Sequence, residues 1–131
     1  MAREVYKGFE EAQLKDMPIE KFMTILTSRE RRTLKRISTN LGFKKLVAKV
    51  KMIMAENPKK VIKTHIREAI ILPEWLGLTF GVHNGKEFKI VTITMEKLGK
   101  RLGDFAHSTG RVIHAGPGIG ATRGSKFVAV K

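Results

Sequence analysis

Cysteine is absent from this 131-residue sequence, which excludes a disulfide framework, a cysteine-ligated zinc and a thiol nucleophile. Long apolar runs are missing as well, since a run such as Ala69 to Leu72 is far too short to cross a bilayer. The first residues contain no apolar stretch of the kind that a secretory signal has. We therefore expect a cytoplasmic protein that does not enter a membrane.

Acidic residues are scarce: 12 Asp and Glu stand against 26 Lys and Arg, which leaves a net charge of +14. A small domain usually carries a net charge of about 2 to 8. Because self-repulsion of this size destabilises a compact chain, the composition predicts a polyanionic partner, most readily a nucleic acid. A membrane surface is the alternative polyanion. It is disfavoured because no amphipathic helix presents bulky aromatic residues opposite its cations.

The positive charge is concentrated in two segments. Residues 28–67 carry a net charge of +11 and residues 99–131 a net charge of +5, whereas residues 1–27 and 68–98 each carry −1. Such segregation indicates that particular segments touch the polyanion.

The N-terminal part has the pattern of three helices. The first is expected to begin at Asp16 to Pro18, with Asp16 as its cap. Thr27 and Glu30 form a predicted capping box that opens a second, strongly basic helix. A third helix is expected over residues 43–56, before Asn57 and Pro58. Its apolar side is predicted to consist of Phe43, Leu46, Val47, Val50 and Met54.

The central part changes to the two-residue period of strands. Residues 78–82 alternate between apolar and polar side chains, and Asn84-Gly85 then predicts a type I′ turn. The strand that follows has apolar side chains on both faces, so a bulge or a two-sided strand is expected. A short helix is predicted from Thr94 to Arg101. The whole pattern indicates a small α+β domain with a short sheet.

Beyond about residue 106, too few apolar residues remain to order the chain alone. The predicted organisation is therefore a basic helical extension (residues 1–57), an α+β core (residues 58–106) and a glycine-rich basic tail (residues 107–131). Gly116 to Gly120 lacks the Gly-Lys-Ser/Thr ending of a P-loop and the flanking strand and helix of a dinucleotide fold. We interpret these glycines as backbone that approaches another surface closely.

Catalytic and metal chemistry find no support in the sequence. The four histidines share no metal-ligand spacing, and Asp104 is the only carboxylate after Glu96, so the acid cluster of a two-metal nuclease is missing. His107 and Ser108 have no third group that would make a nucleophilic site. We predict no catalytic residue, no metal ligand and no cofactor.

Four aromatic residues admit two interpretations. They form either a base-stacking platform or part of the hydrophobic core. Because they fall where an α+β core needs filling, the pattern favours the core for Trp75, Phe80, Phe88 and Phe105.

Two basic runs predict the contacts with a polyanion. Five cations lie within residues 29–36, where arginine forks bind phosphate and only Glu30 compensates. We favour phosphate contact there over a merely solvated basic face. Residues 59–67 alternate imperfectly between basic and apolar side chains, as in an edge strand that presents cations to a groove. The alternative is a strand whose lysines guard its edge against aggregation.

Several motifs resemble the small-subunit ribosomal protein nineteen family, whose eukaryotic cytosolic members are numbered fifteen. They include Asn84-Gly85-Lys86, Leu98-Gly99 and Leu102-Gly103-Asp104-Phe105, in order and at the spacing of the family. Gly116-Pro117-Gly118-Ile119-Gly120 and the basic run 31–36 resemble its archaeal and eukaryotic branch. The resemblance extends from about Met17 to Lys131.

The resemblance implies a non-catalytic constituent of the small ribosomal subunit, folded as a small α+β domain. Members bind the 3′ major domain of small-subunit ribosomal RNA in the head and pair with head protein thirteen. Their basic tail runs toward the decoding site and the A-site transfer RNA. The charge pattern and the resemblance together predict RNA contacts at Arg29, Arg31, Arg32, Lys35, Arg36, Lys44, Lys45, Lys60, Lys63, His65, Arg67, Lys86, Lys100, Arg101, Arg111, His114, Arg123 and Lys126.

One alternative shares the same charge distribution. A free RNA chaperone or a regulatory RNA-binding protein would also be basic, non-enzymatic and cytoplasmic, but it would not sediment with ribosomes.

Overall fold

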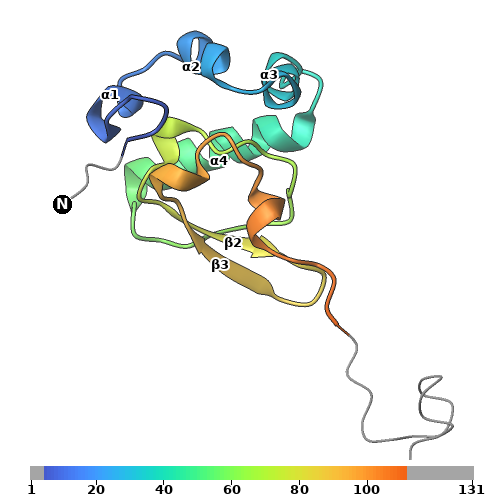
Figure 1. Cartoon of the computed structure of the whole chain (residues 1–131). Helices are drawn as coiled ribbons and strands as arrows, with labels where there is room; N and C mark the ends of the chain where they lie inside the picture. The colour runs from blue at the N-terminus through green and yellow to red at the C-terminus, as the bar shows by residue number, and fades with distance from the viewer. Residues whose placement is uncertain (1–4, 112–131) are drawn as a thin grey trace, which may run out of the picture.

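The structure is a computed structural model that describes residues 5–111. Four helices come first, followed by three strands interspersed with short 3₁₀ helices (Figure 1). The α-helices are α1 (Glu11–Lys15), α2 (Ile19–Ile25), α3 (Ser28–Lys35) and α4 (Leu41–Glu56). The strands are β1 (Ile62–Thr64), β2 (Thr79–His83) and β3 (Phe88–Thr92). The 3₁₀ helices are η1 (Pro73–Trp75), η2 (Met95–Lys97) and η3 (Leu102–Phe105). This arrangement confirms the predicted α+β class.

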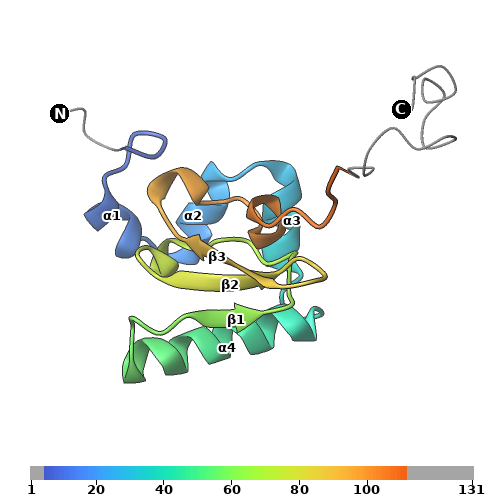
Figure 2. The same cartoon turned by 90° about the horizontal axis from the view of Figure 1, so that it is seen from below.

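The three strands form one sheet in the order β1-β2-β3. β1 runs parallel to β2 with Ile62 opposite Phe80, and β3 runs antiparallel to β2 with Val91 opposite the same phenylalanine. The basic segment around β1 therefore does lie at a sheet edge, as its pattern predicted. Figure 2 shows α4 running alongside β1.

The register gives the sheet two unlike faces. Residues that pair directly across neighbouring strands point to the same face. One face carries Ile62, Phe80 and Val91, which are all buried. The opposite face carries side chains such as Lys63 and Phe88, and Figure 1 shows the helices gathered on one side of the β2–β3 hairpin. β3 is thus the two-sided strand that the sequence allowed, and its pairing with β2 runs through without a bulge.

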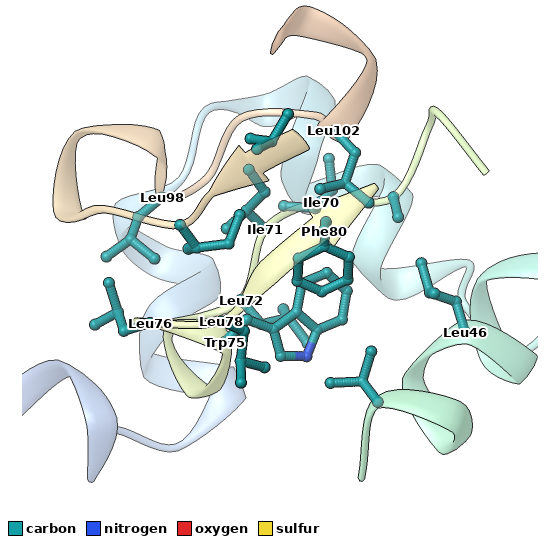
Figure 3. Packing of buried hydrophobic residues seen from close by; sticks show 14 of the residues in the cluster. Leu46, Ile70, Ile71, Leu72, Trp75, Leu76, Leu78, Phe80, Leu98 and Leu102 are labelled. Atoms are coloured by element: carbon teal, nitrogen blue, oxygen red, sulfur yellow. The ribbon is translucent and has the colours of Figure 1, made fainter. Parts of the chain in front are cut away.

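A single hydrophobic cluster joins the helices to the sheet. Trp75 of η1 lies at its centre, with its ring 5.1 Å from that of Phe80 and 6.5 Å from that of Phe43. Figure 3 shows Trp75 against Phe80, with Leu46 of α4 on one side and Leu98 on the other. The cluster also includes Leu14 of α1, so side chains from both sides of residue 57 share one core.

The helix α4 buries one stripe at helical spacing, formed by Phe43, Leu46, Val50 and Ile53. Met54 was predicted to lie in this stripe, but it is 38% exposed. One residue corresponds to about a third of a helical turn, so Ile53 takes the inward position and Met54 is rotated toward solvent.

Two predicted helix starts are wrong in detail. Pro18, not Asp16, occupies the N-cap position of α2, and Asp16 instead ends the short, unpredicted helix α1. Thr27 does stand at the N-cap of α3, but its side chain makes no capping hydrogen bond. The expected capping partner Glu30 lies beside Tyr6 instead.

The hairpin turn also differs from the predicted type I′ turn. The loop between His83 and Phe88 has four residues, and only Gly85 has a positive φ, of 100°. The Asn84 side chain accepts the N–H groups of Lys86 at 3.0 Å and Glu87 at 2.8 Å. Because this amide oxygen takes the place of a backbone acceptor, a wider loop satisfies its donors without a left-handed Asn84.

The predicted helix from Thr94 to Arg101 is reduced to the single turn η2. Gly99 has a φ of 72°, which turns the chain back. Its N–H then donates to the carbonyl of Ile71 at 3.1 Å, while the N–H of Ile71 donates to Lys100 at 2.9 Å. This pairing with a distant segment replaces further helical hydrogen bonds.

Candidate nucleic-acid interface

The outer face of α3 is a row of exposed arginines. Arg29 and Arg32 of α3 and Arg36, its C-cap residue, follow one another at intervals of three and four residues, which places them on one side of the helix axis. Leu34 on the opposite side is buried and holds the helix to the core. Lys35 is exposed as well. We call Arg29, Arg32 and Arg36 the α3 arginine row.

Arg31 of the same helix is used differently. Its Nε donates to the carbonyl of Met23 and its Nη2 to the carbonyl of Leu26, each at 3.0 Å. The side chain is partly buried, and these bonds satisfy carbonyls at the end of α2. Arg31 thus links α2 to α3, which the charge run alone did not predict.

A cleft of about 480 Å³ lies beside the arginine row. It is lined by Thr33, Arg36, Thr39, Asn40, Leu41, Glu68 and Arg101. Arg101 donates from Nη2 to the Thr33 hydroxyl at 2.9 Å and from Nη1 to the Glu68 carbonyl at 3.2 Å. It therefore connects the C-terminal part of the core to α3, while Arg36 remains exposed at the cleft.

The first turns of α4 present two more cations. Lys44 and Lys45 are both exposed, and neither side chain has a hydrogen-bond partner within residues 5–111. Lys49, one turn further on, donates instead to the carbonyl of Lys63 at 2.8 Å and so ties α4 to the edge strand β1.

Around β1, the predicted residues Lys60, Lys63 and His65 are all exposed. The Lys63 ammonium lies over the Phe88 ring, 5.4 Å from its centroid. The His65 ring lies 4.4 Å from that of His83 and 5.2 Å from that of Phe88. His83 was not predicted as a site residue, although the strand pattern placed it opposite the core side of β2.

Arg67 is the most heavily engaged of the predicted residues. Its Nη1 donates to the carbonyl of His83 at 2.7 Å, and its Nη2 donates to the carbonyls of Gly103 at 3.0 Å and of Ala106. It closes the end of the sheet against η3. Its structural use was invisible in the sequence, because its partners lie up to 39 positions away.

Three further predicted cations, Lys86, Lys100 and Arg111, are exposed. The other predicted site residues, His114, Arg123 and Lys126, lie outside the described residues. The structure therefore does not bring all eighteen predicted positions to one surface. It separates a larger exposed group from the three partly buried arginines 31, 67 and 101.

Within residues 5–111, the predicted basic residues form no salt bridge. Between described residues, the one salt bridge is Lys15 with Glu11 at 2.6 Å, and no predicted site residue takes part in one. A polyanion that approaches α3 therefore meets charges that need not first abandon an internal carboxylate. Such a surface suits the phosphates of a nucleic acid.

The described part of the chain contains neither a metal-binding cluster nor a membrane-spanning helix. No group of three or more His, Asp or Glu side chains is placed there to hold a metal ion. Within residues 5–111, no helix combines the length and apolar content that crossing a membrane requires. The clearest shift in acidity concerns a structural group: burial raises the pKa of Tyr6, and the nearby Glu30 carboxylate raises it further.

Comparison with known proteins yields one consistent family. A family model described as "Ribosomal protein S19" matches residues 32–114. A "Small ribosomal subunit protein uS19" of Methanococcus maripaludis strain C6 is 49% identical over 131 residues, covering 96% of this chain and 80% of the relative. Proteins of the same name from Methanococcus aeolicus and Methanococcus vannielii are 47% and 44% identical, again over 96% of this chain and 80% and 81% of their own lengths.

Proposed function

The chain belongs to the ribosomal protein S19 family, and from this membership we propose that it binds ribosomal RNA in the head of the small subunit. Membership makes the protein a non-enzymatic structural constituent of the small ribosomal subunit, and hence a cytoplasmic ribosomal protein of the archaeal type. The finer proposal concerns which RNA it meets, through which surface, and in what company.

The observation that carries the proposal is the α3 arginine row. Three exposed guanidinium groups lie on one helix face, beside a polar cleft and without carboxylate partners among the described residues. Guanidinium groups bind phosphate oxygens through paired hydrogen bonds, and their contact with RNA releases condensed counterions. A row of this kind favours the RNA backbone as its ligand.

The proposed mechanism is phosphate neutralisation combined with docking by shape. Contacts to phosphate and ribose position a protein on RNA while carrying little sequence information. In this proposal the α3 arginine row, Lys35, Lys44 and Lys45 bind one stretch of backbone. Lys60 and Lys63 beside β1, together with Lys86 and Lys100, bind others. Arg31, Arg67 and Arg101 chiefly hold the elements in place.

The tail and the partners complete the proposal. We assign His114, Arg123 and Lys126, together with Arg111, to a basic tail (residues 107–131) that extends toward the decoding site and the A-site transfer RNA. The helical extension (residues 1–57) and the α+β core (residues 58–106) would dock on the 3′ major domain, next to head protein thirteen. These assignments rest on the family resemblance and on the segregated charge.

Sedimentation tests the proposal directly. A lysate is separated on a sucrose gradient, and the protein is located by mass spectrometry before and after a high-salt wash of the subunits. We expect stoichiometric recovery with the small subunit. Recovery in the light fractions would instead favour the free RNA chaperone or regulatory RNA-binding protein.

A second experiment tests the division between free and engaged arginines. Replacing Arg29, Arg32 and Arg36 by Gln should lower affinity for a 3′ major domain transcript. It should also flatten the dependence of log K on log salt, by up to about one unit per lost contact. Arg31→Gln is the matched control, since it should lower the free energy of unfolding and leave most of the salt slope intact. If Arg31→Gln flattened the salt slope by a third or more of the change seen in the triple variant, the division between free and engaged arginines would be contradicted.

A further inference from the structure

We propose that the outer face of the sheet is a stacking platform for unpaired RNA bases, centred on His65, His83 and Phe88. This inference rests on the proposed function and assigns to the sheet a second mode of RNA contact, distinct from phosphate binding. The two modes differ physically, because stacking uses ring faces and is far less sensitive to salt.

The register assembles the platform from three strands. His83 of β2 pairs directly with Phe88 of β3, and His65 follows the last residue of β1 on the same side. The three rings touch one another, with centroids 4.4 Å apart for the two histidines and 4.9 Å apart for His83 and Phe88. Phe88 stands at 73° to both imidazoles, and the two imidazoles are inclined at only 36° to each other.

A neighbouring row across the sheet supplies charge and apolar surface. Lys63, Gly81 and Ile90 are paired in register, with Lys63 over the Phe88 ring and Ile90 58% exposed. A Cβ on Gly81 would lie 3.3 Å from the Lys63 side chain and 3.5 Å from that of Phe88. Because glycine occupies the middle position, the lysine and the phenylalanine can meet above the strand.

Lys63 and His65 are exposed on this surface, whereas His83 and Phe88 are half-buried. Phe88 is not among the partly buried residues that pack against the core. Of the four aromatic residues expected in the core, Phe88 is therefore the exception. Trp75 and Phe80 are buried, whereas Phe88 lies on the opposite face of the sheet.

Charge and ring chemistry together select RNA bases as the occupant. The face carries Lys63 and no carboxylate at its paired positions, so a polyanion approaches it without repulsion. Each base has a flat π-face that stacks on aromatic or imidazole rings, and single-stranded segments expose it. A duplex alone would offer only phosphates and ribose, which can contact Lys63 but cannot stack on the three rings.

The test compares a single-stranded oligoadenylate of about ten nucleotides with an abasic ribose-phosphate oligomer of the same length. Binding of the full-length protein to each is measured by fluorescence anisotropy at several salt concentrations. Wild type should prefer the base-bearing probe by about tenfold, the order expected for one stacked base. His65→Leu with Phe88→Leu should remove the preference without changing the salt slope.

Matched variants keep the result specific. Phe105→Leu is the control. The Lys97 ammonium lies 5.4 Å from the centroid of the Phe105 ring, but this ring packs against the core. The preference of this variant for the base-bearing probe should therefore equal that of the wild type. His83 is left intact because its Nδ1 accepts the N–H of Gly85 at 3.0 Å. His65→Leu alone alters an exposed side chain, so it reports on stacking even where Phe88→Leu loosens the hairpin.

Each outcome of this test either supports or overturns the stacking platform. Loss of the preference in the leucine variants supports the platform. A preference retained by them, or a wild type that binds both probes equally, overturns the platform while phosphate binding stands. A third outcome is that small subunits reconstituted with the leucine variants lose another subunit protein, while the variants bind both probes as the wild type does. That outcome would assign this face to a protein partner and overturn the proposal. A wild type that binds neither probe nor the 3′ major domain transcript would instead defeat the proposed function itself.

Discussion

At the scale of single residues, Gly99 lies where the end of the core packs against the N-terminal segment. It has a φ of 72°, and a Cβ built on it would lie 2.5 Å from Leu26 Cδ2 and 2.9 Å from Tyr6 Oη. Both the backbone conformation and the space therefore demand glycine. Because Leu26 ends α2, this contact holds the helical extension against the turn after η2.

We predict that Gly99→Ala lowers the free energy of unfolding by about 2–5 kcal/mol, from left-handed strain and overpacking together. Gly77→Ala is the control, since Gly77 has a φ of 82° but no atom within 4 Å of its built Cβ. It isolates the backbone cost, about 1–2 kcal/mol. Urea unfolding monitored by Trp75 fluorescence measures both. Equal losses of unfolding free energy in the two variants would show that Leu26 and Tyr6 move aside for the added methyl group at little cost.

Arg67 shows how a cation that was predicted to bind RNA can also hold the fold together. Arg67→Gln removes its guanidinium from three carbonyl groups, and we expect a loss of about 2–4 kcal/mol in the free energy of unfolding, since partly buried acceptors lose a charged donor. Lys60→Gln, at an exposed side chain with no partner among residues 5–111, should stay within about 0.5 kcal/mol. Urea denaturation distinguishes them. A neutral Arg67→Gln would mean that these bonds contribute no net stability.

At the scale of elements, α4 is the longest helix described and links the arginine row to the sheet. Asn40 caps it by accepting the N–H of Phe43 at 3.1 Å. The same side chain donates to the Glu68 carboxylate at 2.8 Å. Since Asn40 and Glu68 both line the cleft beside Arg36, the cap also sets the geometry of the candidate interface.

Asn40→Ala should therefore lower the free energy of unfolding by about 1 kcal/mol, with a range of 0.5–2. Thr27→Ala is the matched control, because Thr27 occupies the N-cap position of α3 without making the capping bond. It should change stability by less than about 0.5 kcal/mol. Chemical denaturation midpoints measure the difference. Similar losses at the two caps would mean that Asn40 contributes no more than an uncapped position.

At the scale of the whole molecule, the net charge of +14 opposes folding and favours RNA binding. The described residues offset it with a single exposed ion pair between Lys15 and Glu11. Such a pair stabilises a helix by less than about 0.5 kcal/mol, so screening by salt is the main relief available to the free protein.

Salt should therefore affect stability and binding with opposite sign. Raising ionic strength from about 0.01 to 0.15 M shortens the Debye length from about 30 to 8 Å. Tm should rise, by about 4–8 °C for each 1 kcal/mol of repulsion removed, while affinity for the RNA transcript falls. Calorimetry on the wild type and on the variant without the α3 arginine row measures this, and the variant should respond less. A Tm that is independent of salt would contradict the role of self-repulsion.

The sequence predicted where the positive charge of the candidate site lies, but not which basic side chains are exposed and which bind carbonyl groups inside the fold. The run 29–36 correctly indicated an exposed basic helix, because several cations with one carboxylate cannot all be satisfied locally. The same run did not distinguish Arg31, which binds carbonyls of α2, from Arg32, which is exposed. The two arginines are adjacent in the sequence, and only the packing of α2 against α3 gives them different roles.

The sequence by itself determined the α+β class, the family, the segregation of charge and the two-sided character of β3. These properties depend on composition, on the spacing of apolar residues and on the order of motifs. All three can be read from the sequence without knowing which distant residues are in contact. The tertiary structure alone decided which arginines serve as internal links and which rings gather on the outer sheet face. The physical reason is distance along the chain: Arg67 meets Ala106, and His65 meets Phe88, only after the strands and η3 have come together.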